Sequence, residues 1–159
     1  MAASFAGHET TVEALCSRNA SVSARAADGM HAVAVAALAG QASVLEILIR
    51  HGSPEVLDLP VSKRKTTPVM FAALHAVRSG DTRGVAHLVE AGADPDLQDA
   101  SGLTAMDLAS NQLRAARPSA PPPLVSAATP SSAASDERLA ALTRALAGGL
   151  APLGQGGRG

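Results

Sequence analysis

Aromatic residues are almost absent from this chain of 159 residues, and their scarcity sets the first limit on its fold. Phe5 and Phe71 are the only two, and there is no tryptophan or tyrosine. Because 47% of the residues are nevertheless hydrophobic, the core must be built from Ala, Leu, Val and Ile. Side chains of this kind suit closely packed small helices better than a β-sandwich.

Other scarcities exclude further classes of protein. A single cysteine, Cys16, cannot form an internal disulfide and points to a reducing compartment or to indifference to redox conditions. No apolar run reaches the roughly 18 residues that a membrane-spanning helix needs, and the first residues lack the pattern of a secretory signal. A net charge of −1 gives no bulk attraction to nucleic acid or to an acidic membrane. We therefore expect an intracellular protein, cytoplasmic or nuclear, with neither nucleic acid nor a membrane as its partner.

The residue patterns of catalysis and metal binding are missing as well. The sequence contains no nucleophile elbow, no P-loop, no dinucleotide glycine fingerprint and no Cys or His pair at metal-ligand spacing. The stretch GADPDLQDASG carries Asp94, Asp96 and Asp99, but a calcium loop of the EF-hand kind starting at Asp94 needs glycine where Asp99 stands. It also needs glutamate where Ala105 stands. The sequence thus predicts no enzyme, no catalytic residue, no cofactor and no metal site.

What the sequence does contain is an internal repeat. An offset of 33 residues relates a set of matching positions, namely Gly7 and Gly40, Val12 and Leu45, Leu15 and Leu48, and Asn19 and Gly52. The next unit is longer, with residues inserted in PEVLDLPVSKRK and in AALHAVRSG. Each unit reads as a turn, a short Ala-rich helix and an amphipathic helix that ends near a glycine. In one unit Thr67 is placed to cap the short helix and Pro68 to occupy its first position.

These units resemble the ankyrin repeat. The resemblance is carried by TPV at 67–69, EAGADPD at 90–96, the Asp28-Gly29 turn and SGLT at 101–104, together with the period. It implies an all-α solenoid of stacked helix-turn-helix units with finger turns. We expect the repeats to cover residues 1–116, divided into a partial unit 1–25, complete units 26–58 and 59–97, the latter with the insertions, and a partial unit 98–116. Two departures stand out: Lys65 occupies the place of the turn glycine, and His31-Ala32 replaces Thr-Pro.

The resemblance also suggests roles for single residues. Short carboxylate side chains in a turn accept hydrogen bonds from nearby backbone N–H groups, so Asp94, Asp96 and Asp99 are expected to shape the finger that contains them. Cys16 matches Ile49 of the next unit and is expected to be buried.

The C-terminal part has a different composition. Residues 117–134 are rich in Pro, Ser and Ala and predict a linker, in which a proline cluster is a candidate ligand for an aromatic-lined module. Residues 135–149 predict an amphipathic helix with Ser135 as its N-cap and a stripe of Leu139, Leu142 and Leu146. This helix either caps the stack as the displaced last helix or binds a partner independently. Residues 150–159 predict a disordered tail.

For function, the resemblance implies a non-catalytic protein-protein interaction module that binds another protein through the concave face of its repeats, as a monomer. Candidate partner-binding residues lie on the three fingers, namely Asp28, Met30, His31, Arg64, Lys65, Thr66, Gln98, Ala100, Ser101 and Leu103. Thr66 is also a candidate phosphorylation site, because basic residues precede it. Two alternatives stay open: a regulatory fragment of a larger ankyrin-containing enzyme or channel, and a degenerate structural array without a ligand.

Overall fold

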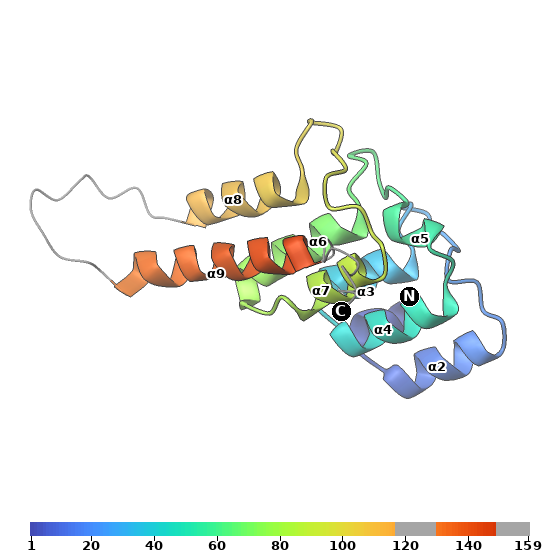
Figure 1. Cartoon of the computed structure of the whole chain (residues 1–159). Helices are drawn as coiled ribbons and strands as arrows, with labels where there is room; N and C mark the ends of the chain where they lie inside the picture. The colour runs from blue at the N-terminus through green and yellow to red at the C-terminus, as the bar shows by residue number, and fades with distance from the viewer. Residues whose placement is uncertain (117–129, 149–159) are drawn as a thin grey trace, which may run out of the picture.

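The regular secondary structure of the described residues is helical, as a computed structural model shows (Figure 1). The structure describes residues 1–116 and 130–148. Residues 117–129 of the linker predicted at 117–134, and the tail predicted at 150–159, lie outside them. The helices of the described part are α1 (Ala2–Ala6), α2 (Glu9–Ser17), α3 (Ala32–Ala39), α4 (Ala42–His51), α5 (Glu55–Asp58), α6 (Pro68–Ser79), α7 (Arg83–Glu90), α8 (Ala105–Ala116) and α9 (Pro130–Ala147).

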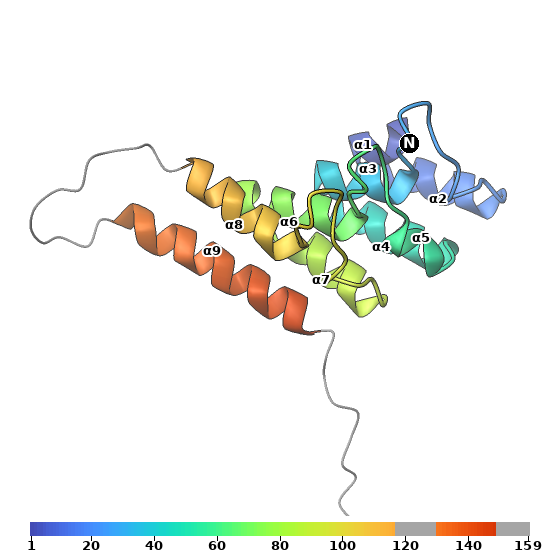
Figure 2. The ribbon, with the colours of Figure 1, turned by 90° about the horizontal axis from the view of Figure 1, so that it is seen from above.

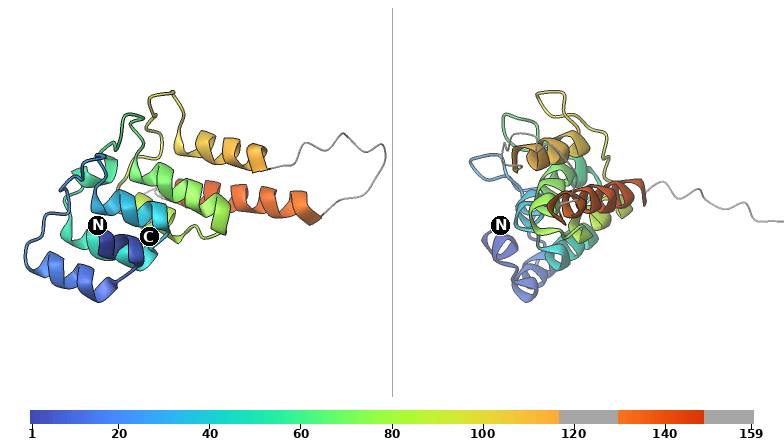
Figure 3. Two further views of the ribbon diagram at one scale, coloured as in Figure 1. Left: turned by 180° about the vertical axis from the view of Figure 1, so that it is seen from behind. Right: turned by 90° about the vertical axis from the view of Figure 1, so that its left-hand side faces the viewer.

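The helices form two layers. An inner layer runs α1, α3, α6, α8 and an outer layer runs α2, α4, α7, α9, with each helix contacting the next one of its own layer (Figure 2). Loops before the inner helices form a first finger (residues 18–31), a second finger (52–67, which includes α5) and a third finger (91–104). The right-hand view of Figure 3 shows that the fingers project on the side of the inner layer. This arrangement is the all-α solenoid with finger turns that the resemblance to ankyrin repeats implies.

Small aliphatic side chains fill the space between the layers. Fully buried residues such as Val33, Leu45, Met70 and Leu88 come from alternate layers and belong to one continuous hydrophobic cluster. Gly84 permits part of this packing, because a Cβ there would lie 3.3 Å from Cδ1 of Leu45. A core poor in aromatic residues therefore holds together through the close approach of short helices.

Glycine turns join α1 to α2, α3 to α4 and α6 to α7. Gly40 ends α3 with φ 72°, a left-handed conformation that costs other residues free energy. The imidazole of His75, on α6 of the next unit, covers its Cα so closely that a Cβ would collide with the ring. Gly7 and Gly80 repeat this turn with φ 78° and 84°.

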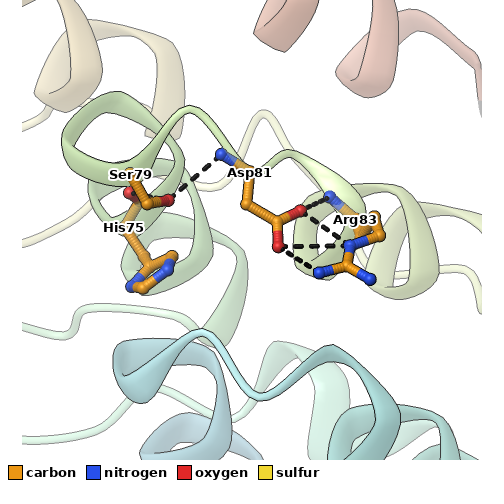
Figure 4. A network of polar contacts seen from close by, with 4 residues as sticks. All are labelled: His75, Ser79, Asp81 and Arg83. Atoms are coloured by element: carbon orange, nitrogen blue, oxygen red, sulfur yellow. Dashed lines mark hydrogen bonds and ion pairs between the residues drawn. The ribbon is translucent and has the colours of Figure 1, made fainter.

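Polar contacts fix the turn between α6 and α7 (Figure 4). The Ser79 hydroxyl donates to the carbonyl of His75 at 2.9 Å, and its oxygen accepts the N–H of Asp81 at 3.1 Å. The Asp81 carboxylate accepts the backbone N–H of Arg83 at 3.0 Å and its guanidinium at 2.7 Å. These bonds from Arg83 lower the pKa of Asp81 to about 2, so the turn keeps its ion pair over a wide pH range.

The last helix begins earlier than its sequence suggests. α9 starts at Pro130, so Ser135 lies inside the helix and is not its N-cap, and residues 130–134 are helical. α9 runs antiparallel to α8 and contacts α6, α7 and α8 (Figure 1). Leu142 is fully buried, with Leu139 and Leu146 partly buried beside it. The helix therefore takes the place of the outer helix of the last unit.

Candidate functional site

The three fingers share one backbone conformation just before each inner helix. Gly29, Lys65 and Gly102 occupy equivalent positions, with φ values of 82°, 53° and 77°. Lys65, a departure from the repeat because it replaces the turn glycine, keeps the left-handed conformation, although an L side chain is disfavoured there. In the first finger the Asp28 carboxylate accepts the N–H of Met30 at 3.0 Å. The turns place the exposed side chains of the fingers at fixed positions.

The aspartates of the third finger also bind its backbone. Asp94 accepts the N–H of Asp96 at 2.9 Å. Asp99 accepts the N–H groups of Ser101 at 2.7 Å and Leu103 at 3.0 Å. The turn-forming role predicted for Asp94 and Asp99 is confirmed, whereas Asp96 contributes its N–H and exposes its side chain. Within residues 1–116 and 130–148 no group of three or more His, Cys, Asp or Glu side chains is placed to hold a metal ion.

Hydrogen bonds join the fingers into one surface. The Arg25 guanidinium of the first finger donates to the carbonyl of Pro60 in the second at 3.1 Å. The carbonyl of Arg64 in the second finger accepts the N–H of Ala100 in the third at 2.8 Å. Near the bases of these two fingers, Asp58 accepts the N–H of Asp94 at 2.9 Å.

His31 is not a surface residue, which corrects one of the predicted contacts. Its side chain is fully buried at the start of α3, where Nδ1 accepts the N–H of Ala34 at 3.4 Å. Since Nδ1 accepts, Nε2 carries the proton and donates it to the carbonyl of Leu59 at 3.3 Å. Burial lowers the pKa of His31, which favours this neutral ring. His31 therefore caps α3 and connects it to the second finger.

Thr66 is also buried. Its burial corrects the prediction that Thr66 is exposed to a partner or to a kinase. Its backbone pairs with Val61 through bonds of 2.9 and 3.2 Å, and this pair closes the turn formed by residues 62–65. The neighbouring Thr67 and Pro68 begin α6 as expected, with the Thr67 N–H donating to Sδ of Met70 at 3.4 Å.

The other predicted contacts are accessible on the fingers. Six of them are exposed, namely Asp28, Arg64, Lys65, Gln98, Ala100 and Ser101. Met30 and Leu103 are half-buried. The structure brings the accessible residues of the second and third fingers close together through the bond between Arg64 and Ala100.

A second set of accessible residues was missed by sequence reasoning. We call it the inner stripe, because its apolar side chains lie on the accessible side of the inner helices, and it consists of Phe5, Val35, Leu38, Phe71, Leu74 and Leu108. Phe5 is 60% exposed and Leu38 40% exposed, while the other members are half-buried. The candidate residues predicted from the sequence lay only on the fingers, although the concave face was expected to carry the partner. The available signal was the repeat itself, which places Phe5 and Leu38 at matching positions.

Cys16 is half-buried rather than buried, with part of its side chain packed against the core. Burial raises the pKa of its thiol, which disfavours the reactive thiolate at neutral pH. The position therefore behaves as a packing site and not as an activated nucleophile.

Comparisons with known proteins agree with this architecture. Residues 1–99 match the family model for ankyrin repeats in three copies. No curated protein matches the chain significantly. In the part of the chain that the structure describes, no helix combines the length and apolarity needed to cross a bilayer. The family match covers more than half of the sequence, so this chain belongs to the ankyrin repeat family, whose domains are generally protein-interaction modules and typically non-catalytic.

Proposed function

We propose that this chain binds a protein partner through the inner stripe and the exposed parts of the three fingers. The observation that carries the proposal is the inner stripe, an apolar row on the accessible side of several consecutive inner helices. Single exposed apolar residues are common on protein surfaces, but a row that continues across neighbouring elements is typical of an interaction site.

The chemistry of this face suits a protein interface. The chain's only aromatic residues, Phe5 and Phe71, both belong to the inner stripe. Aromatic side chains contribute much of the free energy of binding at interfaces because they bury large areas with few rotatable bonds. The exposed polar residues of the fingers, such as Arg64, Gln98 and Ser101, supply the polar rim that surrounds such a centre.

Within this proposal the chain is non-catalytic, monomeric and intracellular. The raised pKa of the Cys16 thiol supports a non-catalytic role. Packing of α9 against α7 and α8 supports a monomer, because it covers one end of the stack.

Affinity capture from an extract of the cells that express the protein tests the proposal. The full chain, a double variant Leu38→Gln with Leu74→Gln, and a control are immobilised and the retained proteins are identified by mass spectrometry. Ser43→Asp with Thr143→Asp is the control, because both side chains are exposed on outer helices. We expect a protein that the wild type and the control retain and the stripe variant loses. If the stripe variant retains the same proteins as the wild type, this face is not the binding face.

A further inference from the structure

The first and second fingers, which lead into the inner helices α3 and α6, carry a cluster of cations. We call this cluster the basic tip, and it consists of Arg25, Lys63, Arg64 and Lys65, all exposed. The described residues contain two ion pairs, Arg50 with Glu46 and Arg83 with Asp81, and neither involves the basic tip. The cations are therefore available to an external anion.

The backbone holds the basic tip in place. The pair between Val61 and Thr66 closes the turn that carries Lys63 to Lys65. Arg25 is fixed beside it by its bond to the carbonyl of Pro60, and the carbonyl of Arg64 is fixed by the N–H of Ala100. Because the second finger is anchored on both sides, the backbone that carries these side chains loses little freedom when a ligand binds.

A cation also lies near the end of α6 that is far from the second finger. Arg78 is exposed near the end of α6 and follows Phe71 and Leu74 at helical spacing, so it shares their side of the helix. Along α6, Phe71 and Leu74 therefore lie between the second finger and Arg78. A segment that crosses the inner stripe along α6 has a cation at each end.

We propose, resting on the proposed function, that the partner presents a segment in which apolar residues are flanked by Asp or Glu. Its apolar side chains cover the inner stripe, and its carboxylates lie against the basic tip and Arg78. Charge complementarity of this kind selects the partner and speeds its association more than it raises affinity.

The third finger favours an acidic protein segment over a nucleic acid. Asp96 and Asp99 lie on this finger, which the bond between Arg64 and Ala100 holds directly beside the basic tip. A continuous phosphate backbone that left the basic tip in that direction would meet like charges, whereas a peptide with locally placed carboxylates would not. The inner stripe is also mostly aliphatic and offers few faces on which bases stack.

A displayed library of random linear peptides, selected on the full chain, tests the inference. We expect the recovered peptides to combine apolar residues with an excess of Asp and Glu. Their binding should weaken about tenfold in the variant Lys63→Glu with Arg64→Glu, since two attractive contacts become repulsive. Added salt should weaken it as well. The control Arg50→Glu with Arg144→Glu changes the net charge equally on the outer helices α4 and α9 and should bind as the wild type does.

The possible failures separate this inference from the proposed function. Peptides that need Leu38 and Leu74 but show no acidic excess, or that tolerate the reversed basic tip, overturn the inference and leave the proposed function standing. The inference is also overturned if no recovered peptide depends on the inner stripe. The proposed function fails too if, in the affinity capture, the stripe variant retains the same proteins as the wild type. A labelled single-stranded DNA that binds the wild type, but not the variant with the reversed basic tip, would reassign these cations to nucleic acid.

Discussion

Replacing Gly40 with alanine should destabilise the stack for two separable reasons. The first is the left-handed backbone, φ 72°, which costs an L residue about 1–2 kcal/mol. The second is the imidazole of His75, which occupies the space that the new Cβ needs. Displacing a packed side chain typically costs about 1–3 kcal/mol more, so we expect a total loss of about 2–5 kcal/mol.

Gly102→Ala is the matched control for the backbone contribution. Gly102 has a similar φ of 77°, but a Cβ there would meet nothing within 4 Å. We therefore expect this variant to lose only the first contribution. Urea melts followed by circular dichroism give both free energies of unfolding.

A double-mutant cycle with His75→Ala isolates the contact between the two units. In the background of Gly40→Ala, removing the ring should restore about 1–3 kcal/mol, because the collision disappears. The reasoning fails if Gly40→Ala and Gly102→Ala are equally destabilised, or if His75→Ala makes the Gly40→Ala protein less stable. Either result would mean that the ring does not pack on this turn.

Two further predictions use the same urea melts. Leu142→Ala should lower the free energy of unfolding by about 2–5 kcal/mol, because it empties a fully buried site on α9. Its control, Thr143→Ala at an exposed position, should change the free energy of unfolding by at most about 0.5 kcal/mol. Equal effects would show that α9 does not pack on the stack. The second prediction concerns pH. Burial lowers the pKa of His31 in the folded protein, so the neutral ring contributes to the free energy of unfolding. This contribution is fully present above the unfolded pKa of about 6.5 and is lost as the pH falls through the lower folded pKa. The test variant is His31→Thr, because threonine stands at the equivalent cap positions Thr67 and Thr104. Between neutral and mildly acidic pH this variant should lose less stability than the wild type. An identical pH dependence of the two proteins would contradict the role of His31.

Local rules made much of the fold readable in the sequence. The turn at Asp28-Gly29 and the start of α6 at Thr67-Pro68 both follow from backbone geometry and hydrogen bonds between near neighbours. The turn role of Asp99 was predictable for the same reason, since its partners are Ser101 and Leu103. Residues of this kind meet their partners within one turn of chain, so the sequence alone determines what they do.

The binding face, by contrast, was decided by tertiary structure. His31 and Thr66 belong to the fingers in the sequence, yet both are buried. His31 is bonded to the carbonyl of Leu59, and the backbone of Thr66 pairs with that of Val61. Leu38 and Leu45 have the same side chain, yet Leu45 is fully buried and Leu38 is exposed. Exposure depends on which elements pack over a side chain, and in a stack those elements come from the next unit as well as from the same one. The sequence by itself therefore determined the repeats and their turns, while the packing of the two layers decided which residues a partner can reach.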